Sequence, residues 1–224
     1  MLAWSSNLRQ HTEVRILLTL VISLVICLPS HTAVASAPTA LSILNKLEVK
    51  GRAAKTGYTR SQFSHWSDPD RNGCDSRNDI LKRDLKMISF KDGTRNCKVI
   101  SGELVDPFSG KKIRFDLNTS VSNVDIDHIV ALSNAWQTGA AYFDKNTRSN
   151  IANDPLNLLA VDASLNRQKG DGDAATWLPP LKSFRCEYVA RQVAVKFKYK
   201  LWVTVPEKNA ITNILAKCPK QVIP

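Results

Sequence analysis

Three short segments in the second half of the chain constrain its fold most. "VDIDHIV", from residue 124, and "NLLAVD", from residue 157, are strand-like runs, and "ASLNRQKGD", directly after the second run, is typical of a helix. Two short strands are at best marginally stable by themselves and need a helix or further strands to pack against them. The order of the segments therefore predicts a unit of strand, strand and helix.

Polar residues occupy defined positions in this unit. Asp127 and His128 end the first run, Asn157 opens the second, and Asn166 lies in the expected helix. A lone Asp-His pair is more often structural than catalytic. The ordered set of four residues is far more specific, and it resembles the ββα-metal fold of HNH nucleases.

The resemblance extends along the chain. "GYTRSQF", "WSDPDRNGCDSR", "NDPLNLLAVDASLNRQKGDGDAATWLPP" and "CEYVARQVAVKFKYKLWV" look like secreted HNH endonucleases related to the C-terminal part of the GmrSD restriction enzymes. These segments span most of residues 56 to 205. We expect an α+β fold in which an HNH ββα-metal core is accompanied by surrounding helices, a β-hairpin and two disulfides.

The resemblance implies a role for each polar residue. His128 would be the general base that takes a proton from the attacking water, and Asn157 would tie the intervening loop and help to orient the base. Asp127 and Asn166 would hold one divalent ion, Mg²⁺ or alternatively Mn²⁺, with water completing its shell. Asn166 stands where the family often has His, and its oxygen suits a hard cation. Asp125 shares a strand face with Asp127 and is either a support for the site or an exposed strand acid.

Basic residues near this unit are candidate phosphate contacts. On a helix, Lys169 and Asn166 share a face because they are three residues apart. A solvated surface charge is the alternative for each candidate. The candidates are Arg148, Arg167 and Lys169, whereas Lys196, Lys198 and Lys200 are expected to form a general basic surface.

The remaining segments are expected to surround the core. Residues 36–55 form an N-terminal extension with a short helix at 40–50, and the nuclease domain spans residues 56–224. A hairpin is expected in "CKVISGELVDPFSGKKIRFD" because "DPFSG" is turn-like. The last third predicts two antiparallel helices, one from about residue 184 to residue 203 and one that begins near Pro206.

Four cysteines follow the expected leader: Cys74, Cys97, Cys186 and Cys218. An even count in an exported chain indicates two disulfides, with three possible pairings. A zinc site is the weaker alternative, because no two cysteines are close in sequence. The antiparallel helices favour Cys186 with Cys218, which leaves Cys74 with Cys97.

The first 35 residues are predicted to be a signal peptide. Arg9 and Arg15 precede an apolar run from Ile16 to Leu28, and small residues precede the expected cleavage after Ala35. The run is short for a membrane span, which needs about 20 residues; an uncleaved anchor is the alternative. We therefore expect a secreted or periplasmic protein without stable membrane association after cleavage.

A second acidic segment has the spacing of a calcium-binding loop. Its residues at positions 1, 3, 5, 6 and 12 of such a loop are Asp68, Asp70, Asn72, Gly73 and Asp79. Position 12 is Asp instead of the usual Glu, and no helix clearly precedes the segment. A turn that Cys74 anchors is therefore the preferred interpretation.

The chain is strongly basic. It has 31 Lys and Arg against 20 Asp and Glu, a net charge of +11 that falls to about +10 without the leader, which suits a polyanionic partner. We expect a metal-dependent endonuclease that acts on nucleic acid, DNA rather than RNA, with low sequence specificity because no base-reading module is apparent. The rival interpretation is a non-catalytic secreted protein that binds nucleic acid or acidic polysaccharide. A Ser-His-Asp hydrolase would have to use His65 or His128, and no GxSxG turn supports it.

Overall fold

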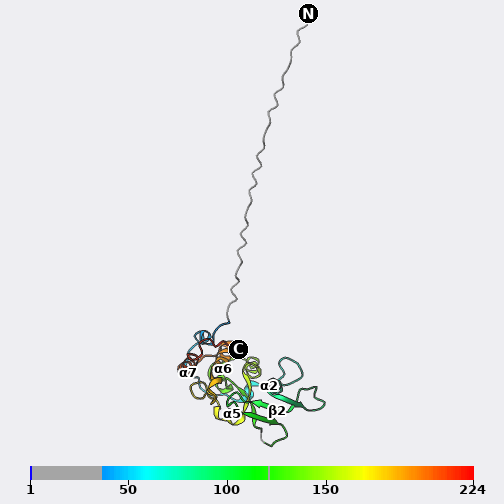
Figure 1. Cartoon of the computed structure of the whole chain (residues 1–224). Coiled ribbons are helices and arrows are strands. Elements are labelled where there is room, and N and C mark those ends of the chain that lie inside the picture. The colour runs from blue at the N-terminus through cyan, green and yellow to red at the C-terminus, as the bar shows by residue number, and fades with distance from the viewer. Residues whose placement is uncertain (2–36, 121) are drawn as a thin grey trace. The chain divides into compact units, whose positions relative to one another are not determined.

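Two small antiparallel sheets and seven α-helices make up the described part of the computed structural model, which comprises residue 1, residues 37–120 and residues 122–224 (Figure 1). The predicted apolar run of the signal peptide lies outside these residues. None of the helices in the described part is long and apolar enough to span a membrane.

The elements follow one another in a mixed order. The strands are β1 (Lys86–Phe90), β2 (Val99–Val105), β3 (Lys112–Asp116), β4 (Val124–His128) and β5 (Leu158–Asp162). The α-helices are α1 (Ala40–Leu44), α2 (Ser76–Asp84), α3 (Leu132–Gln137), α4 (Lys145–Asn153), α5 (Ala163–Lys169), α6 (Arg185–Lys198) and α7 (Val205–Leu215). Short 3₁₀ helices are η1 (Arg60–Phe63), η2 (Ala140–Tyr142) and η3 (Lys182–Phe184).

The antiparallel pair β4–β5 lies between two hydrophobic clusters. One side of the pair carries Ile126 and Leu158, which are buried in a cluster with residues of α2 and of the sheet β1–β2–β3. The other side carries Leu159 and Val161, which belong to the cluster around α1, α6 and α7. Asp127 is the register partner of Leu159 across the two strands. Partner residues point to the same face of a sheet, so the Asp127 side chain lies on the same side as Leu159.

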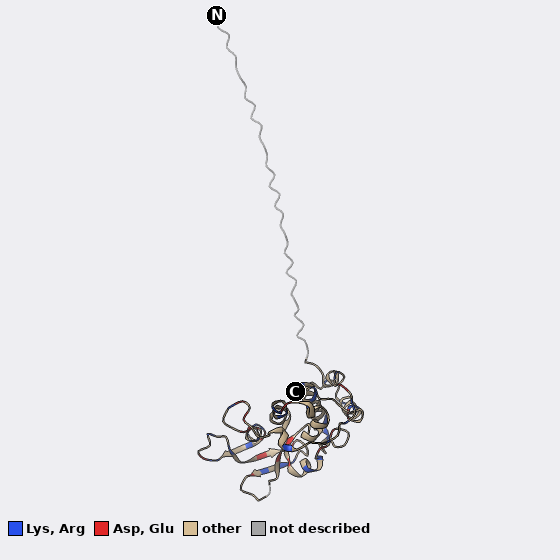
Figure 2. Ribbon diagram, turned by 180° about the vertical axis from the view of Figure 1, so that it is seen from behind, with Lys and Arg blue, Asp and Glu red and all other residues tan. Residues whose placement is uncertain are grey.

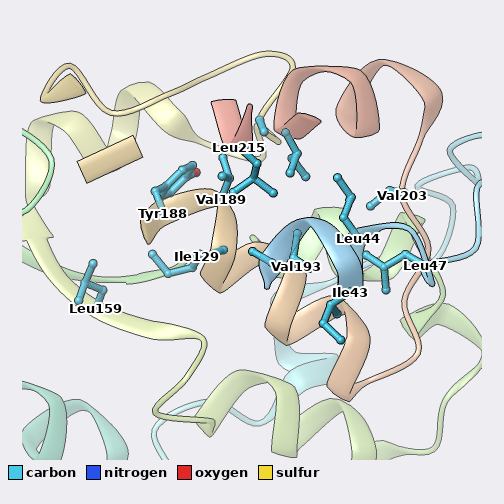
Figure 3. Close-up of a cluster of buried hydrophobic side chains, with 14 of the residues drawn as sticks. Ile43, Leu44, Leu47, Ile129, Leu159, Tyr188, Val189, Val193, Val203 and Leu215 are labelled. Atoms are coloured by element: carbon cyan, nitrogen blue, oxygen red, sulfur yellow. The ribbon is translucent and has the colours of Figure 1, made fainter. Parts of the chain in front are cut away.

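Helix α6 provides the centre of the second cluster. Val189 and Val193 of α6 are fully buried, and Leu44 of α1 and Leu215 of α7 pack with them (Figure 3). Helix α7 begins with a capping box in which Thr204 accepts from the Glu207 N–H and Glu207 accepts from the Thr204 N–H. Helices α6 and α7 contact each other, and the disulfide between Cys186 and Cys218 joins the start of α6 to the residues just after the end of α7, as in an antiparallel pair.

Both disulfides join the cysteines that the sequence favours. Cys186 and Cys218 link the start of α6 to the residues after α7. Cys74 and Cys97 link the segment before α2 to the segment before β2. The structure thus confirms the α+β class, the ββα unit of β4, β5 and α5, the hairpin of β2 and β3, and the antiparallel helix pair.

Several elements differ from the sequence predictions. The first helix ends at Leu44 instead of residue 50. Helix α6 ends at Lys198, because Tyr199 and Lys200 form a turn in which Lys200 has a φ of 53°, and Val203 then pairs with Val49 in a parallel bridge. The sequence analysis missed β1 and α4. Lys196 is not a surface residue: it is buried and forms an ion pair with Glu207 at 2.7 Å.

Candidate functional site

A polar cleft of about 200 Å³ lies where β4 and α5 both end. It contains three of the four residues that the sequence singled out, Asp127, His128 and Asn166, although they are distant in sequence. The lining residues are Tyr58, Arg60, Ile126, Asp127, His128, Ala131, Leu132, Asn166, Gly170 and Asp171. The ββα arrangement therefore brings the predicted residues to one place.

The imidazole of His128 is held in one orientation. Its Nε2 lies 2.9 Å from the backbone oxygen of Ala152 in α4, and Trp66 packs against the ring with centroids 5.7 Å apart. Because a carbonyl oxygen can only accept, Nε2 carries the hydrogen and Nδ1 keeps a free lone pair. Burial lowers the pKa of His128 to about 3, so the ring is neutral at physiological pH.

Asn157 does not line the cleft but fixes the loops behind it. Its Oδ1 accepts from the Val130 N–H at 2.8 Å, and its Nδ2 donates to the carbonyls of Val130 and Ile151 at 3.3 and 3.1 Å. Ile151 directly precedes Ala152, whose carbonyl holds the His128 ring. The buried Asn157 amide thereby ties the end of β4 to α4, as the sequence analysis expected of a residue that orients the base.

Asp127 and Lys169 form a buried ion pair. The Lys169 ammonium donates to Asp127 Oδ1 and to the His128 carbonyl, both at 2.9 Å, and its side chain is fully buried. Burial raises the pKa of Asp127, while the charge of Lys169 opposes this shift. Oδ2 of Asp127 is buried and has no hydrogen-bond partner in the described part of the chain.

Asn166 offers a second oxygen at the cleft. Its Nδ2 donates to Asp125 Oδ2 at 3.2 Å, so Asp125 holds the Asn166 side chain, which favours a supporting role for Asp125 over that of an exposed strand acid. Its Oδ1 has no hydrogen-bond partner among the described residues. Asp127 Oδ2 and Asn166 Oδ1 are hard oxygen donors on the wall of one cleft, so the residues fit a divalent cation such as Mg²⁺ with water in its remaining positions.

The three candidate phosphate contacts lie in different environments. Lys169 is buried against Asp127 and is not an exposed phosphate contact in this structure. Arg148 donates to the backbone oxygens of Gln62 and Phe143 and to the Gln62 side chain, and it lies over the Trp136 ring, so its guanidinium serves the packing of α4. Arg167 is exposed on α5 and remains available for a phosphate.

The sequence analysis missed three polar residues of the cleft. Tyr58 and Arg60 reach it from a segment almost 70 residues before His128, and Asp171 follows α5. Asp171 pairs with Lys55 at 2.6 Å. Tyr58 and Arg60 belong to "GYTRSQF", which carries the family resemblance, but no spacing rule connects this segment to Asp127 and His128.

Residues 68–75 form a turn that leads into α2, and its side chains also contact Asp79 in the first turn of that helix. The backbone N–H groups of Asn72 and Gly73 donate to Asp68, and the Asn72 amide donates to Asp70 and Asp79. Among the described residues, no group of three or more His, Cys, Asp or Glu side chains is arranged to hold a metal. These contacts support the interpretation of a turn. A metal site at Asp127 and Asn166 would have a single carboxylate and would depend on water for the rest of its shell.

Comparisons with known proteins identify the family of the chain. The model of the GmrSD restriction endonuclease C-terminal domain matches residues 75–214, which include the whole ββα unit. An uncharacterized secreted protein of Arthroderma benhamiae is 38% identical over 192 residues, which are 85% of this chain and 90% of that protein. No solved structure matches the chain. The chain belongs to the GmrSD restriction endonuclease C-terminal domain family.

Proposed function

We propose that this protein is a metal-dependent HNH endonuclease that hydrolyses phosphodiester bonds of nucleic acid, with DNA as the preferred substrate. The observation that carries the proposal is the cleft itself: the neutral His128 ring, whose Nδ1 keeps its lone pair, lines it together with Asp127 and Asn166. Asp127 Oδ2 and Asn166 Oδ1 have no hydrogen-bond partner among the described residues. Membership of a restriction endonuclease domain family supports a nuclease-related function.

His128 supplies the proton transfer in this mechanism. Nδ1 accepts a proton from the attacking water, and Nε2–H continues to donate to the Ala152 carbonyl, which stabilises the resulting imidazolium. Asn157 keeps that carbonyl in place by holding Ile151. Asp127 and Asn166 would hold the divalent ion, Mg²⁺ or alternatively Mn²⁺, which when bound would supply charge neutralisation on the phosphoryl oxygens and help for the departing 3′ oxygen.

The charge of the chain supports a polyanionic substrate. Lys and Arg exceed Asp and Glu by eleven over the whole chain, and Figure 2 shows them spread over helices and strands of the domain. A distributed positive surface favours contacts with backbone phosphates over base reading, which accounts for the proposed low sequence specificity. A protein that merely binds nucleic acid or polysaccharide would not require an oriented neutral histidine in one cleft with Asp127 and Asn166.

We also propose that the protein is exported, with residues 1–35 as its signal peptide, and that it acts in the periplasm or outside the cell. Two disulfides support an oxidising compartment. The relative from Arthroderma benhamiae is named a secreted protein.

Replacement of the two histidines outside the leader tests the proposal. His128→Ala should reduce nicking of supercoiled DNA by about 10²–10⁴-fold, as expected for loss of a general base, while DNA affinity measured in EDTA stays near that of the wild type. His65→Ala is the matched control, because His65 does not line the cleft, and it should retain most activity. Nicking by His128→Ala at near the wild-type rate would overturn the assignment of the base. Comparable losses in both variants would favour a hydrolase that uses both histidines.

A further inference from the structure

We propose that Arg60 binds the scissile phosphodiester in the cleft and stabilises the charge that develops on its non-bridging oxygens. This inference rests on the proposed endonuclease function and extends it to a residue outside the ββα unit. Arg60 also lies before the range that the family model matches, residues 75–214.

Among the described residues that line the cleft, Arg60 is the one cationic side chain, and it has no ion-pair partner there. Lys169, beneath Asp127, is buried and paired with it, and Lys55, near the rim, is paired with Asp171 at 2.6 Å. The Arg60 side chain lines the cleft, is exposed, and forms no hydrogen bond or ion pair with any described residue. A phosphate that enters the cleft can therefore bind Arg60 without breaking an existing ion pair.

The backbone that carries Arg60 is firmly anchored. Arg60 opens η1, and Phe63 at the end of η1 is fully buried. Gln62 in the middle accepts hydrogen bonds from Arg148 through its backbone oxygen at 3.2 Å and its side-chain oxygen at 3.1 Å. Arg148 therefore has a positioning role: it fixes η1 against α4, the same helix whose Ala152 carbonyl holds His128. Helix α4 therefore contacts both the 3₁₀ helix that carries Arg60 and the His128 ring, and it fixes their relative position.

Electrostatics agree with this placement. After burial, which is the main cause, the positive charge of Arg60 contributes to the low pKa of His128, and it also contributes to the lowered pKa of His65. A guanidinium close enough to influence the imidazole is also close to the anion on which that imidazole would act.

The chemistry of the cleft selects a phosphate group. A guanidinium presents parallel N–H donors that match two oxygens of a phosphate. The volume of about 200 Å³ is below the roughly 300–1,000 Å³ of pockets that enclose whole small molecules. The cleft therefore suits one phosphodiester of a strand that runs across it, with the nucleosides outside.

Single-turnover cleavage with phosphorothioate substrates tests this contact. Short duplexes carry sulfur in place of one or the other non-bridging oxygen at a defined cleavage site, as separate stereoisomers. Wild type, Arg60→Ala, Arg60→Lys and Arg114→Ala are compared in Mg²⁺, and their affinities for the same duplex are measured in EDTA. Arg114 is an exposed arginine of β3 that does not line the cleft, so it is the matched control.

Arg60→Ala should lower the rate on the all-oxygen substrate by about 10²–10³-fold, the usual loss when one donor to a developing oxyanion is removed. Arg60→Lys should recover part of this rate, because it restores charge without the two-pronged geometry. For one stereoisomer, the penalty that sulfur imposes on the wild type should shrink in Arg60→Ala. Arg114→Ala should keep both the rate and the sulfur penalties.

Two results would overturn the assignment: cleavage by Arg60→Ala at the rate of Arg114→Ala, or sulfur penalties that stay unchanged for both stereoisomers. A wild type that cuts no nucleic acid with any divalent ion would refute the endonuclease function instead. In that case, the affinity for the duplex measured in EDTA still tests whether Arg60 contacts a phosphate. Arg60→Ala should weaken affinity and lower the salt slope by about one, and an affinity equal to that of the wild type would refute the phosphate contact.

Discussion

Replacing Lys169 with Met should destabilise the protein by an amount that depends on pH. The buried ammonium donates to Asp127 and to the His128 carbonyl, both at 2.9 Å. Met keeps most of the volume of the aliphatic stem but removes the charge and both hydrogen bonds. Asp127 is then left without a cation in its surroundings, within the described part of the chain.

The loss of stability depends on whether Asp127 stays charged without its partner or takes up a proton. Removing one member of a buried ion pair typically costs about 3–5 kcal/mol. Uptake of a proton by Asp127 limits the charge part of this cost, because a neutral carboxyl needs no cation. With a reference pKa of about 3.9 and about 1.36 kcal/mol per pH unit, the limit is about 4 kcal/mol at pH 7 and about 1.5 kcal/mol at pH 5. The lost bond to the His128 carbonyl adds about 1 kcal/mol.

The direction of the pH dependence follows from the pKa of Asp127. Burial raises this pKa and Lys169 lowers it, so the pKa rises further in Lys169→Met. A carboxyl whose pKa is higher in the folded than in the unfolded state binds more protons when folded, and its contribution to stability falls as pH rises. The deficit of Lys169→Met relative to wild type should therefore grow from pH 5 to pH 7, by up to about 2.7 kcal/mol.

Urea unfolding with the disulfides intact, at pH 5, 6 and 7 in EDTA, measures this deficit. Lys196→Met is the matched control: Lys196 is equally buried and pairs with Glu207, away from the cleft. Both variants should show a pH-dependent deficit. Mg²⁺ should then stabilise Lys169→Met more than Lys196→Met, because a cation at Asp127 replaces the lost ammonium. A deficit that is constant with pH, or equal responses of both variants to Mg²⁺, would refute this reasoning.

Three further predictions concern the base, its support and the disulfides. Because the pKa of His128 is lowered to about 3, kcat/KM measured from pH 5 to pH 8 should not fall on the acid side near pH 6.5. A fall near pH 6.5 that disappears in His128→Ala would contradict the buried neutral ring. Asn157→Ala leaves the buried Val130 N–H and the Ile151 carbonyl without their amide partner, so urea unfolding should show a loss of about 2–3 kcal/mol; a loss below about 0.5 kcal/mol would contradict the bridging role. The double replacement of Cys186 and Cys218 by Ser should cost about 2–4 kcal/mol in the same assay, and unchanged stability would speak against a structural bond.

The ββα unit could be predicted because its information is local. β4 and β5 are short runs in which four of the five residues are buried. Helix α5 follows β5 directly, and Asp162 caps it by accepting from the N–H groups of Ser164 and Leu165. The polar residues that end these elements meet automatically once the two strands pair. The antiparallel helices likewise determined one disulfide pairing, and the other followed by exclusion.

The remaining features depend on contacts that are distant in sequence. Helix α4 has few apolar residues and is held by the Asp144 cap and by Arg148, so hydrophobic periodicity does not reveal it, although it supplies the carbonyl that orients His128. Lys169 and Lys196 lie among other basic residues, and only the tertiary partners Asp127 and Glu207 show that they are buried. Charge and helical spacing alone cannot separate such lysines from surface lysines.

The central claim is that cleavage needs a divalent ion held at Asp127 and Asn166. The most direct test is nicking of supercoiled DNA by the wild-type protein after thorough chelation with EDTA, then with Mg²⁺ restored, beside DNA affinity measured in the same EDTA buffer. The account predicts that EDTA abolishes nicking while salt-dependent binding persists, since binding rests on Lys and Arg contacts with phosphates, and that Mg²⁺ restores cleavage. Undiminished nicking in EDTA would contradict it.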